Sequence, residues 1–128
     1  MLAMAEKQDR IRVVCDQIGT PTYARDLANA ILAVLKSHQW VAGIYHFTNE
    51  GAASWYDFAK AIFRIAGKDV NVVPIPTEDY PTPASRPAYS ILDRSRIKAT
   101  YGVEIPHWEE ALADCIKLIQ NQKDNRKQ

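Results

Sequence analysis

Arg86 is the residue of this chain whose type and setting best suit the binding of an anion. It lies in a segment punctuated by Pro76, Pro81, Pro83 and Pro87. Proline fixes its own φ and restrains the residue before it, so the segment is predicted to be a long loop held in an extended path. A guanidinium on such a loop could grip a phosphate or carboxylate through two parallel hydrogen bonds. A surface loop with a solvated arginine is the simpler alternative.

Tyr56 and Lys60 match the Tyr-x-x-x-Lys pattern that short-chain dehydrogenases use to transfer a proton beside a nicotinamide. Four-residue spacing on a helix places both side chains on one face. The context argues against this chemistry, because the pair lies one turn into a predicted helix among core aromatic residues. Nothing upstream resembles a glycine-rich dinucleotide loop. We therefore predict that neither residue is catalytic.

The histidines and cysteines are isolated from one another. His38, His46 and His107 have no second histidine, cysteine or carboxylate at ligand spacing, so no metal site is predicted. The serines have simpler roles as cap or turn residues, and no Ser-His-Asp arrangement can be assembled. Cys15 and Cys115 are far apart, and Cys115 is predicted to be a buried free thiol on a helix. By itself, the chain shows no active site.

Composition limits the class of protein. The 128 residues allow one domain, which would bury about two-thirds of its unfolded surface. With 16 basic and 15 acidic residues the net charge is +1, so no strong electrostatic attraction to nucleic acid or to a membrane surface is expected. No signal peptide or long apolar run is present, so a soluble cytoplasmic protein is expected. Residues 1–7 look like the end of a helix without its beginning, which suggests a fragment, and residues 121–128 are predicted to form a frayed tail.

Strand and helix patterns alternate along the chain, which predicts an α/β fold. Strands are predicted over residues 11–14, 43–48 and 70–75. Helices are predicted after Thr22, after Ser54, after Asp93 and after Pro106, because apolar residues recur there at helical spacing. Thr22 and Asp93 are the expected caps of their helices. Ser54 with Asp57 forms a capping-box variant, and Gly67 is expected to end the helix that Ser54 begins.

Three blocks of the chain resemble dTDP-4-dehydrorhamnose reductases, which are extended short-chain dehydrogenases. The first block is DQIGTPTYARDLA at residues 16–28. The second begins with GIYH at residues 43–46 and continues through Gly51 to SWYDFA at residues 54–59. The third is YPTPASRPAYSILD at residues 80–93. Their order and spacing agree with the family from about residue 11 to residue 120.

The resemblance implies that residues 1–128 are the C-terminal, substrate-binding portion of a Rossmann-type enzyme, with about four helices and short strands. Residues 22–49 would pack against an N-terminal Rossmann domain that lies outside this chain. That domain would hold NADPH (or NADH) and the catalytic Tyr-x-x-x-Lys pair. No catalytic or cofactor-binding residue is therefore expected here, and the fragment alone is predicted to be inactive.

The resemblance also implies roles for individual residues. Arg86 would pair with the diphosphate of a dTDP-sugar. The loop that approaches the sugar would be formed by Gln17, Thr20, Pro21 and Thr22. Some family members hold a divalent cation between subunits through glutamates, but Arg25 stands at the comparable position here, which argues against that metal. A homodimer is a further option.

Three functions follow from these observations. The first is substrate binding within an NADPH-dependent reductase that converts dTDP-4-dehydro-6-deoxy-L-mannose to dTDP-L-rhamnose. The second is a non-catalytic regulatory subunit of reductase-like fold, since a fold alone does not determine chemistry. The third is a reductase or epimerase of another nucleotide sugar, because the diphosphate is common to all such substrates.

Overall fold

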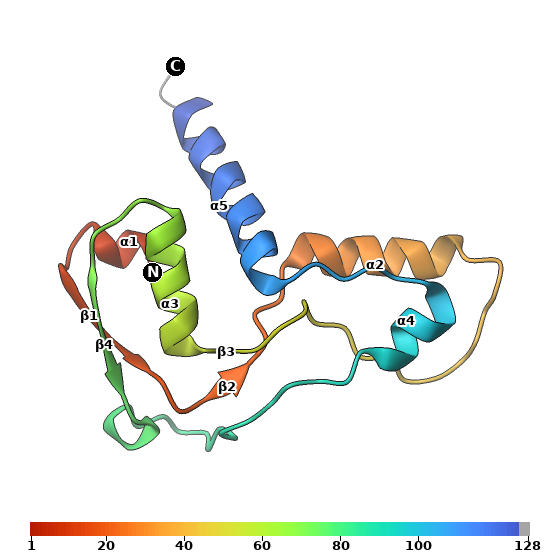
Figure 1. Ribbon diagram of the computed structural model, residues 1–128, viewed down its shortest axis with the longest axis horizontal. Helices are drawn as coiled ribbons and strands as arrows, with labels where there is room; N and C mark the ends of the chain where they lie inside the picture. Colours follow the sequence, from red (N-terminus) through yellow and green to blue (C-terminus); the bar gives the residue numbers. More distant parts are fainter. Residues whose placement is uncertain (126–128) are drawn as a thin grey trace.

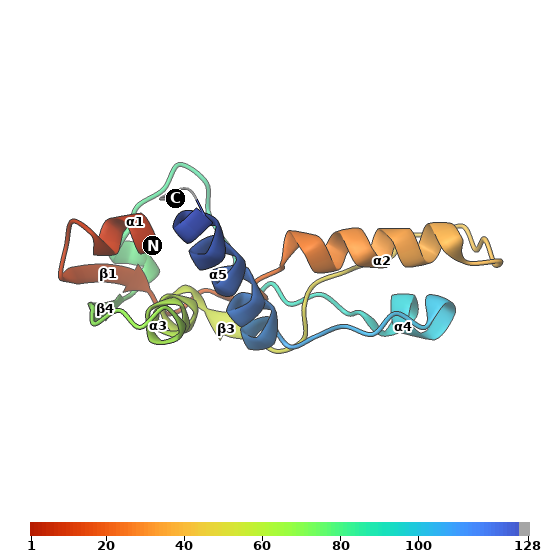
Figure 2. The same cartoon turned by 90° about the horizontal axis from the view of Figure 1, so that it is seen from above.

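The computed structural model describes residues 1–125. The parallel strands β1 (Arg10–Val14) and β4 (Asn71–Ile75) lie beside α3 (Trp55–Ile65). The helices α2 (Ala24–Lys36) and α4 (Ser95–Tyr101) lie at the opposite side of the molecule (Figures 1 and 2). The fold is α/β with short strands, as predicted. In chain order the elements are α1 (Leu2–Ala5), β1 (Arg10–Val14), β2 (Ile18–Gly19), α2 (Ala24–Lys36), β3 (Ala53–Ser54), α3 (Trp55–Ile65), β4 (Asn71–Ile75), a 3-10 turn (Thr77–Asp79), α4 (Ser95–Tyr101) and α5 (Trp108–Asn125).

The parallel pair of strands confirms two of the three predicted strands. β1 and β4 pair in register from Arg10 with Asn71 to Val14 with Ile75. Parallel neighbours need a crossover connection, and the connection between these two strands contains α3. The second sheet is a short antiparallel pairing of β2 with β3, in which Ile18 faces Ser54.

The core lies between β1, α3 and α5. Ile11 and Val13 alternate onto the buried face of β1, as expected for a strand with a period of two. α3 contributes residues at spacings of three and four, which place them on one face of the helix. The members of this core are Ile11, Val13, Ala59, Ile62, Phe63 and Ile116.

The predicted ends of α3 are confirmed. The Asp57 backbone N–H donates to Ser54 Oγ at 3.0 Å, and the Ser54 backbone N–H donates to Asp57 Oδ2 at 3.0 Å, which completes a capping box. At the other end Gly67 has a φ of +64°. The backbone N–H groups of Gly67 and Lys68 donate to the carbonyls of Arg64 and Phe63, which is the Schellman arrangement that glycine permits.

Replacing Ser54 with alanine is expected to lower the free energy of unfolding by about 1 kcal/mol, because the cap loses its acceptor for the Asp57 N–H. Urea denaturation followed by circular dichroism would measure the change. Ser85→Ala is the control, since Ser85 is exposed and makes no hydrogen bond among residues 1–125. Equal stability of the two variants would contradict the capping assignment.

Two predictions from the sequence are wrong. Residues 43–48 form no strand, because in the described part of the chain no neighbouring strand is available to accept their backbone hydrogen bonds. Thr22 does not cap α2: the N-cap is Tyr23, whose N–H donates to Asn49 Oδ1 at 2.8 Å, while the Thr22 hydroxyl bonds the Thr20 carbonyl. The side chain of the N-cap residue makes no capping hydrogen bond, and the distant Asn49 accepts the N–H that precedes the first turn.

Three smaller expectations need correction. The N-cap of α4 is Arg94, although the preceding Asp93 carboxylate still accepts the Ser95 N–H at 2.8 Å. Cys115 is half-buried rather than buried, because it borders a pocket. α5 continues to Asn125, so residues 121–125 of the predicted frayed tail are helical, and residues 126–128 lie outside the described residues.

The apolar face predicted for α2 exists, but much of it is left exposed by the described part of the chain. Leu27, Ile31 and Leu35 recur at helical spacing, yet Leu35 is 63% exposed and Ile31 is 51% exposed. The nearby Ile44 is 78% exposed. Exposed apolar residues gathered on one element indicate a surface that another protein segment covers.

Candidate ligand-binding site

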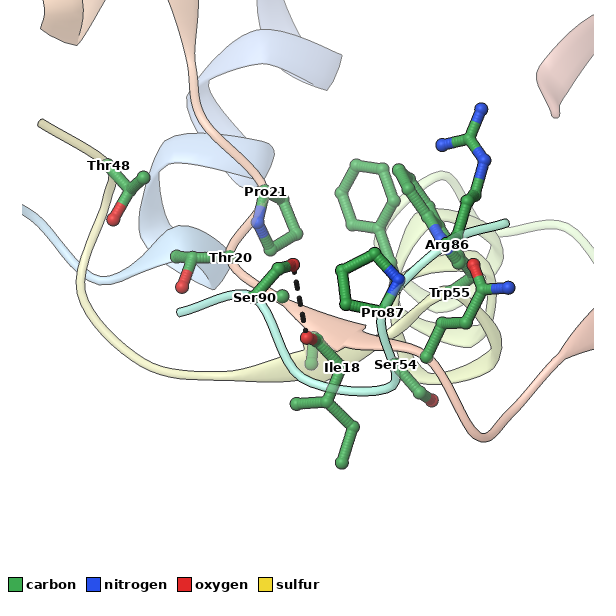
Figure 3. Close-up of a pocket in the computed structure, with 13 residues that line it drawn as sticks. Ile18, Thr20, Pro21, Thr48, Ser54, Trp55, Arg86, Pro87 and Ser90 are labelled. Carbon is green, nitrogen blue, oxygen red and sulfur yellow. Dashed lines mark hydrogen bonds between the residues drawn. The ribbon is translucent and has the colours of Figure 1, made fainter. Parts of the chain in front are cut away.

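A pocket of about 260 Å³ opens where the loop after β1, the start of α3 and the proline-rich loop converge (Figure 3). Its wall is built from three segments that are distant in sequence. The loop and β2 supply Gln17, Ile18, Gly19, Thr20 and Pro21; the approach to α3 and its first turn supply Thr48, Ala53, Ser54, Trp55 and Phe58; the proline-rich loop supplies Arg86, Pro87 and Ser90.

This pocket brings together most of the residues singled out from the sequence. Arg86, Gln17, Thr20 and Pro21 all line it. Thr22 does not; it lines a neighbouring pocket of about 340 Å³ beside α5. Trp55 borders both spaces and was missed from the sequence, where it appeared to be one of the apolar residues of a helix.

Backbone hydrogen bonds attach the proline-rich loop to β2. The Ile18 N–H donates to the Ala88 carbonyl at 2.8 Å, and the Ser90 N–H donates to the Ile18 carbonyl at 2.9 Å. Ser90 Oγ reaches the same carbonyl at 3.4 Å (Figure 3). Gly19 permits this close approach, since a Cβ there would lie 3.1 Å from Ser90 Oγ. The loop is therefore fixed against the floor of the pocket.

A second set of bonds attaches the start of the loop to the end of β1. Asp16 accepts the backbone N–H of Thr77 at 3.0 Å and its hydroxyl at 2.6 Å. These bonds, the hydroxyl first, lower the pKa of Asp16 below its ordinary value of 3.8. Gln17 Nε2 donates to the Thr77 hydroxyl at 3.1 Å. An exposed ion pair of 2.9 Å between Arg12 and Asp79 lies beside them.

Arg86 has no partner of its own in the described part of the chain: it makes neither a hydrogen bond nor an ion pair with residues 1–122 or 125. Its guanidinium points away from the Ile18–Ser90 bond (Figure 3). Arg86 and Trp55 also border a third space of about 400 Å³, walled by β1, α1 and Tyr80. An unpaired guanidinium at the junction of two cavities is well suited to bind an anionic ligand that extends into both.

A buried polar centre beside the pocket connects α2, α4 and α5. The side chain of Asn49 is fully buried and bonds the Tyr23 N–H, the Asp26 carboxylate at 2.7 Å and the Pro106 carbonyl at 3.2 Å. Glu50 pairs with Arg94 at 2.9 Å and with Lys98. The sequence analysis did not single out Asn49 or Glu50, because no local pattern reveals their distant partners.

Protonation of Glu50 is expected to weaken this centre. The hydrogen bond from Lys98, together with the charge of Arg94, lowers the pKa of Glu50 below its ordinary value of 4.5. The stabilisation is therefore present above about pH 4.5 and is lost as the pH falls through the lower folded-state pKa. Thermal midpoints of the wild type and Glu50→Gln should differ above pH 4.5 and converge below it. If the difference in thermal midpoint stayed the same above and below pH 4.5, the stabilising role assigned to the Glu50 carboxylate would be wrong.

The other chemical motifs have structural roles. Tyr56 packs against the core, and Lys60 Nζ lies 5.6 Å from the centre of its ring. The two side chains therefore lie on one face of α3, as the four-residue spacing predicts. Within residues 1–125 no group of His, Cys, Asp and Glu side chains is arranged to hold a metal ion. None of the helices described is long and apolar enough to cross a membrane.

The fold is a small α/β domain with a pocket bordered by Arg86, which has no partner among the described residues. The sequence model of the RmlD substrate-binding domain matches residues 1–121, so the chain belongs to this family. This confirms the resemblance deduced from the three sequence blocks.

Relatives and solved structures agree with the assignment. The chain is 43% identical to the dTDP-4-dehydrorhamnose reductase of Aggregatibacter actinomycetemcomitans, over 88% of this chain and 42% of that protein. It superposes on a dTDP-4-dehydrorhamnose reductase from Clostridium acetobutylicum with a TM-score of 0.87 and 42% identity, covering 93% of this chain and 42% of that one. For the Bacillus anthracis enzyme in complex with NADP, the TM-score is 0.80 and the identity 39%, covering 88% and 38%. The chain thus spans about two fifths of the length of these relatives.

Proposed function

We propose that this chain is the dTDP-sugar-binding part of an NADPH-dependent reductase that converts dTDP-4-dehydro-6-deoxy-L-mannose to dTDP-L-rhamnose. The observation that carries the proposal is the pocket in which the unpaired Arg86 meets Gln17, Thr20 and Pro21 in a member of the RmlD substrate-binding family. The relatives named as dTDP-4-dehydrorhamnose reductases supply the substrate class.

In this proposal Arg86 binds the diphosphate of the substrate. A planar guanidinium can donate two parallel hydrogen bonds to phosphate oxygens, and no carboxylate of the described residues competes for it. The side chains of Thr20, Thr48 and Ser90 line the same pocket and offer hydroxyl groups to a sugar. The binding energy orients the C4 ketone toward the rest of the active site.

The reaction itself requires groups outside this chain. When bound, NADPH supplies the hydride to C4. The five glycines here form no glycine-rich loop, so the cofactor would be held by an N-terminal Rossmann domain, and the proton donor would come from the same domain. The contribution of this chain is therefore to bind and orient the dTDP-sugar. The two free cysteines fit a reducing compartment, and we place the protein in the cytoplasm.

The partner that covers residues 22–49 is proposed to be the protein's own Rossmann domain. The uncovered face of α2 and the exposed Ile44 support an extensive apolar contact there. Residues 43–48, which lack a strand partner among residues 1–125, would complete their hydrogen bonds on the edge of that domain's sheet. Sedimentation of this chain alone tests the alternative occupant, a second copy. A concentration-dependent dimer that Leu35→Glu disrupts would favour self-association over the Rossmann domain.

Nucleotide-sugar titrations of the 15N-labelled chain test the proposal. Shifts confined to residues around Arg86 and Gln17 with dTDP-L-rhamnose, and absent with UDP-glucose, are the expected result. Equal shifts with both ligands would reduce the function to generic diphosphate binding. NADPH oxidation by the chain alone would overturn the proposal that the cofactor site and the proton donor lie outside it. If neither this chain nor the complete protein responded to either nucleotide sugar, a non-catalytic regulatory subunit would be favoured instead.

A further inference from the structure

The orientation of the Gln17 side chain is fixed by the two residues with which it is linked. The Thr77 hydroxyl donates its proton to Asp16 Oδ1 at 2.6 Å. A hydroxyl has a single proton, so toward Gln17 it can only accept. The Gln17 amide must therefore turn its Nε2 group to Thr77, which is the arrangement observed at 3.1 Å.

The other end of the amide is consequently left as a hydrogen-bond acceptor. Gln17 is only 9% exposed, and its Oε1 makes no hydrogen bond within residues 1–125. Oε1 is not fully enclosed by protein atoms, so part of its surface remains accessible. Gln17 lines both the 260 Å³ pocket and the 400 Å³ space. A nearly buried carbonyl oxygen that keeps some accessible surface and has no internal partner is satisfied by a donor from water or from a ligand in the adjoining space.

We propose that Thr77, held by Asp16, is a positioning residue that presents Gln17 Oε1 to a hydroxyl group of the sugar. The inference rests on the proposed function and extends it, because Thr77 itself lines none of the three cavities. Reversing the amide would place Oε1 against the lone pairs of the Thr77 hydroxyl. The hydrogen bonds from Gln17 to Thr77 and from Thr77 to Asp16 thus make the pocket at Gln17 selective for a hydrogen-bond donor rather than an acceptor.

Binding of dTDP-L-rhamnose and of dTDP to the complete protein, measured by calorimetry, tests the inference. Gln17→Leu is expected to raise the Kd for dTDP-L-rhamnose about three- to tenfold, the loss of one neutral hydrogen bond, and to leave the Kd for dTDP unchanged. Thr77→Val should have a similar effect, whereas Thr77→Ser, which keeps the hydroxyl, should bind like the wild type. An equal loss for dTDP would overturn the assignment to the sugar.

A double-mutant cycle distinguishes positioning from general damage. If Thr77 acts through Gln17, the Gln17→Leu/Thr77→Val variant binds no more than about twofold more weakly than Gln17→Leu alone. Additive losses would overturn the positioning role. Thr77→Ala replaces the valine variant if that one fails to fold, as judged by its thermal midpoint. Normal binding by every Thr77 variant would refute this inference alone, whereas absence of binding by the wild type would refute the proposed function with it.

Discussion

Replacing Arg86 with glutamine is expected to raise the Kd for dTDP-L-rhamnose about ten- to a hundredfold, the loss of hydrogen bonds from a charged group at about 1.5–3 kcal/mol. Arg86 has no ion-pair partner among the described residues, so no observed ion pair is broken to bind the ligand. The stability of the fold should change by less than about 0.5 kcal/mol, because Arg86 is exposed. Calorimetric titration of the complete protein measures the first effect and urea denaturation the second.

Two further variants show whether charge or geometry matters at this position. Arg86→Lys keeps the charge but loses the planar pair of donors, so an intermediate Kd is expected. Arg10→Gln removes an exposed arginine that lines none of the three cavities, and it should bind like the wild type. If Arg10→Gln weakened binding as much as Arg86→Gln, the effect would reflect net charge, and the diphosphate role of Arg86 would be wrong.

Replacing Asn49 with leucine is expected to lower the free energy of unfolding by about 3 kcal/mol or more, because several buried groups lose their partners together. The Tyr23 N–H loses its acceptor, and Asp26 and the Pro106 carbonyl lose a donor. The side chain is fully buried, so water cannot replace these bonds in the intact fold. The midpoint and slope of urea denaturation would measure the loss.

The controls for Asn49 separate side-chain chemistry from volume. Asn49→Asp has nearly the same shape, but it places a carboxylate oxygen where Nδ2 now lies 2.7 Å from Asp26, so it should also be strongly destabilising. Asn121→Ala removes an exposed amide on α5 and should change stability by less than about 0.5 kcal/mol. A neutral result for Asn49→Leu would show that the α2, α4 and α5 connections do not depend on this side chain.

Local rules predicted the elements whose signals lie within one or two turns of chain. The Ser54–Asp57 capping box and the stop at Gly67 required only the chemistry of helix ends, and both are confirmed. The pairing strands around Val13 and Val73 followed from β-branched runs. Thr22 misled because its hydroxyl is a good cap by type, yet it bonds the Thr20 carbonyl, and the N-cap is the next residue, Tyr23.

The sequence by itself determined the family, the α/β class, the presence of a proline-rich loop and the presence of Arg86, Gln17, Thr20 and Pro21 as a set. These depend on residue type and spacing along the chain. The tertiary structure alone decided that those four share one pocket while Thr22 faces another, and that Thr77 turns the amide of Gln17. Hydrogen bonds between distant segments determine such directions. No local pattern encodes them, since each partner is an ordinary polar residue until folding brings it within 3 Å of the other.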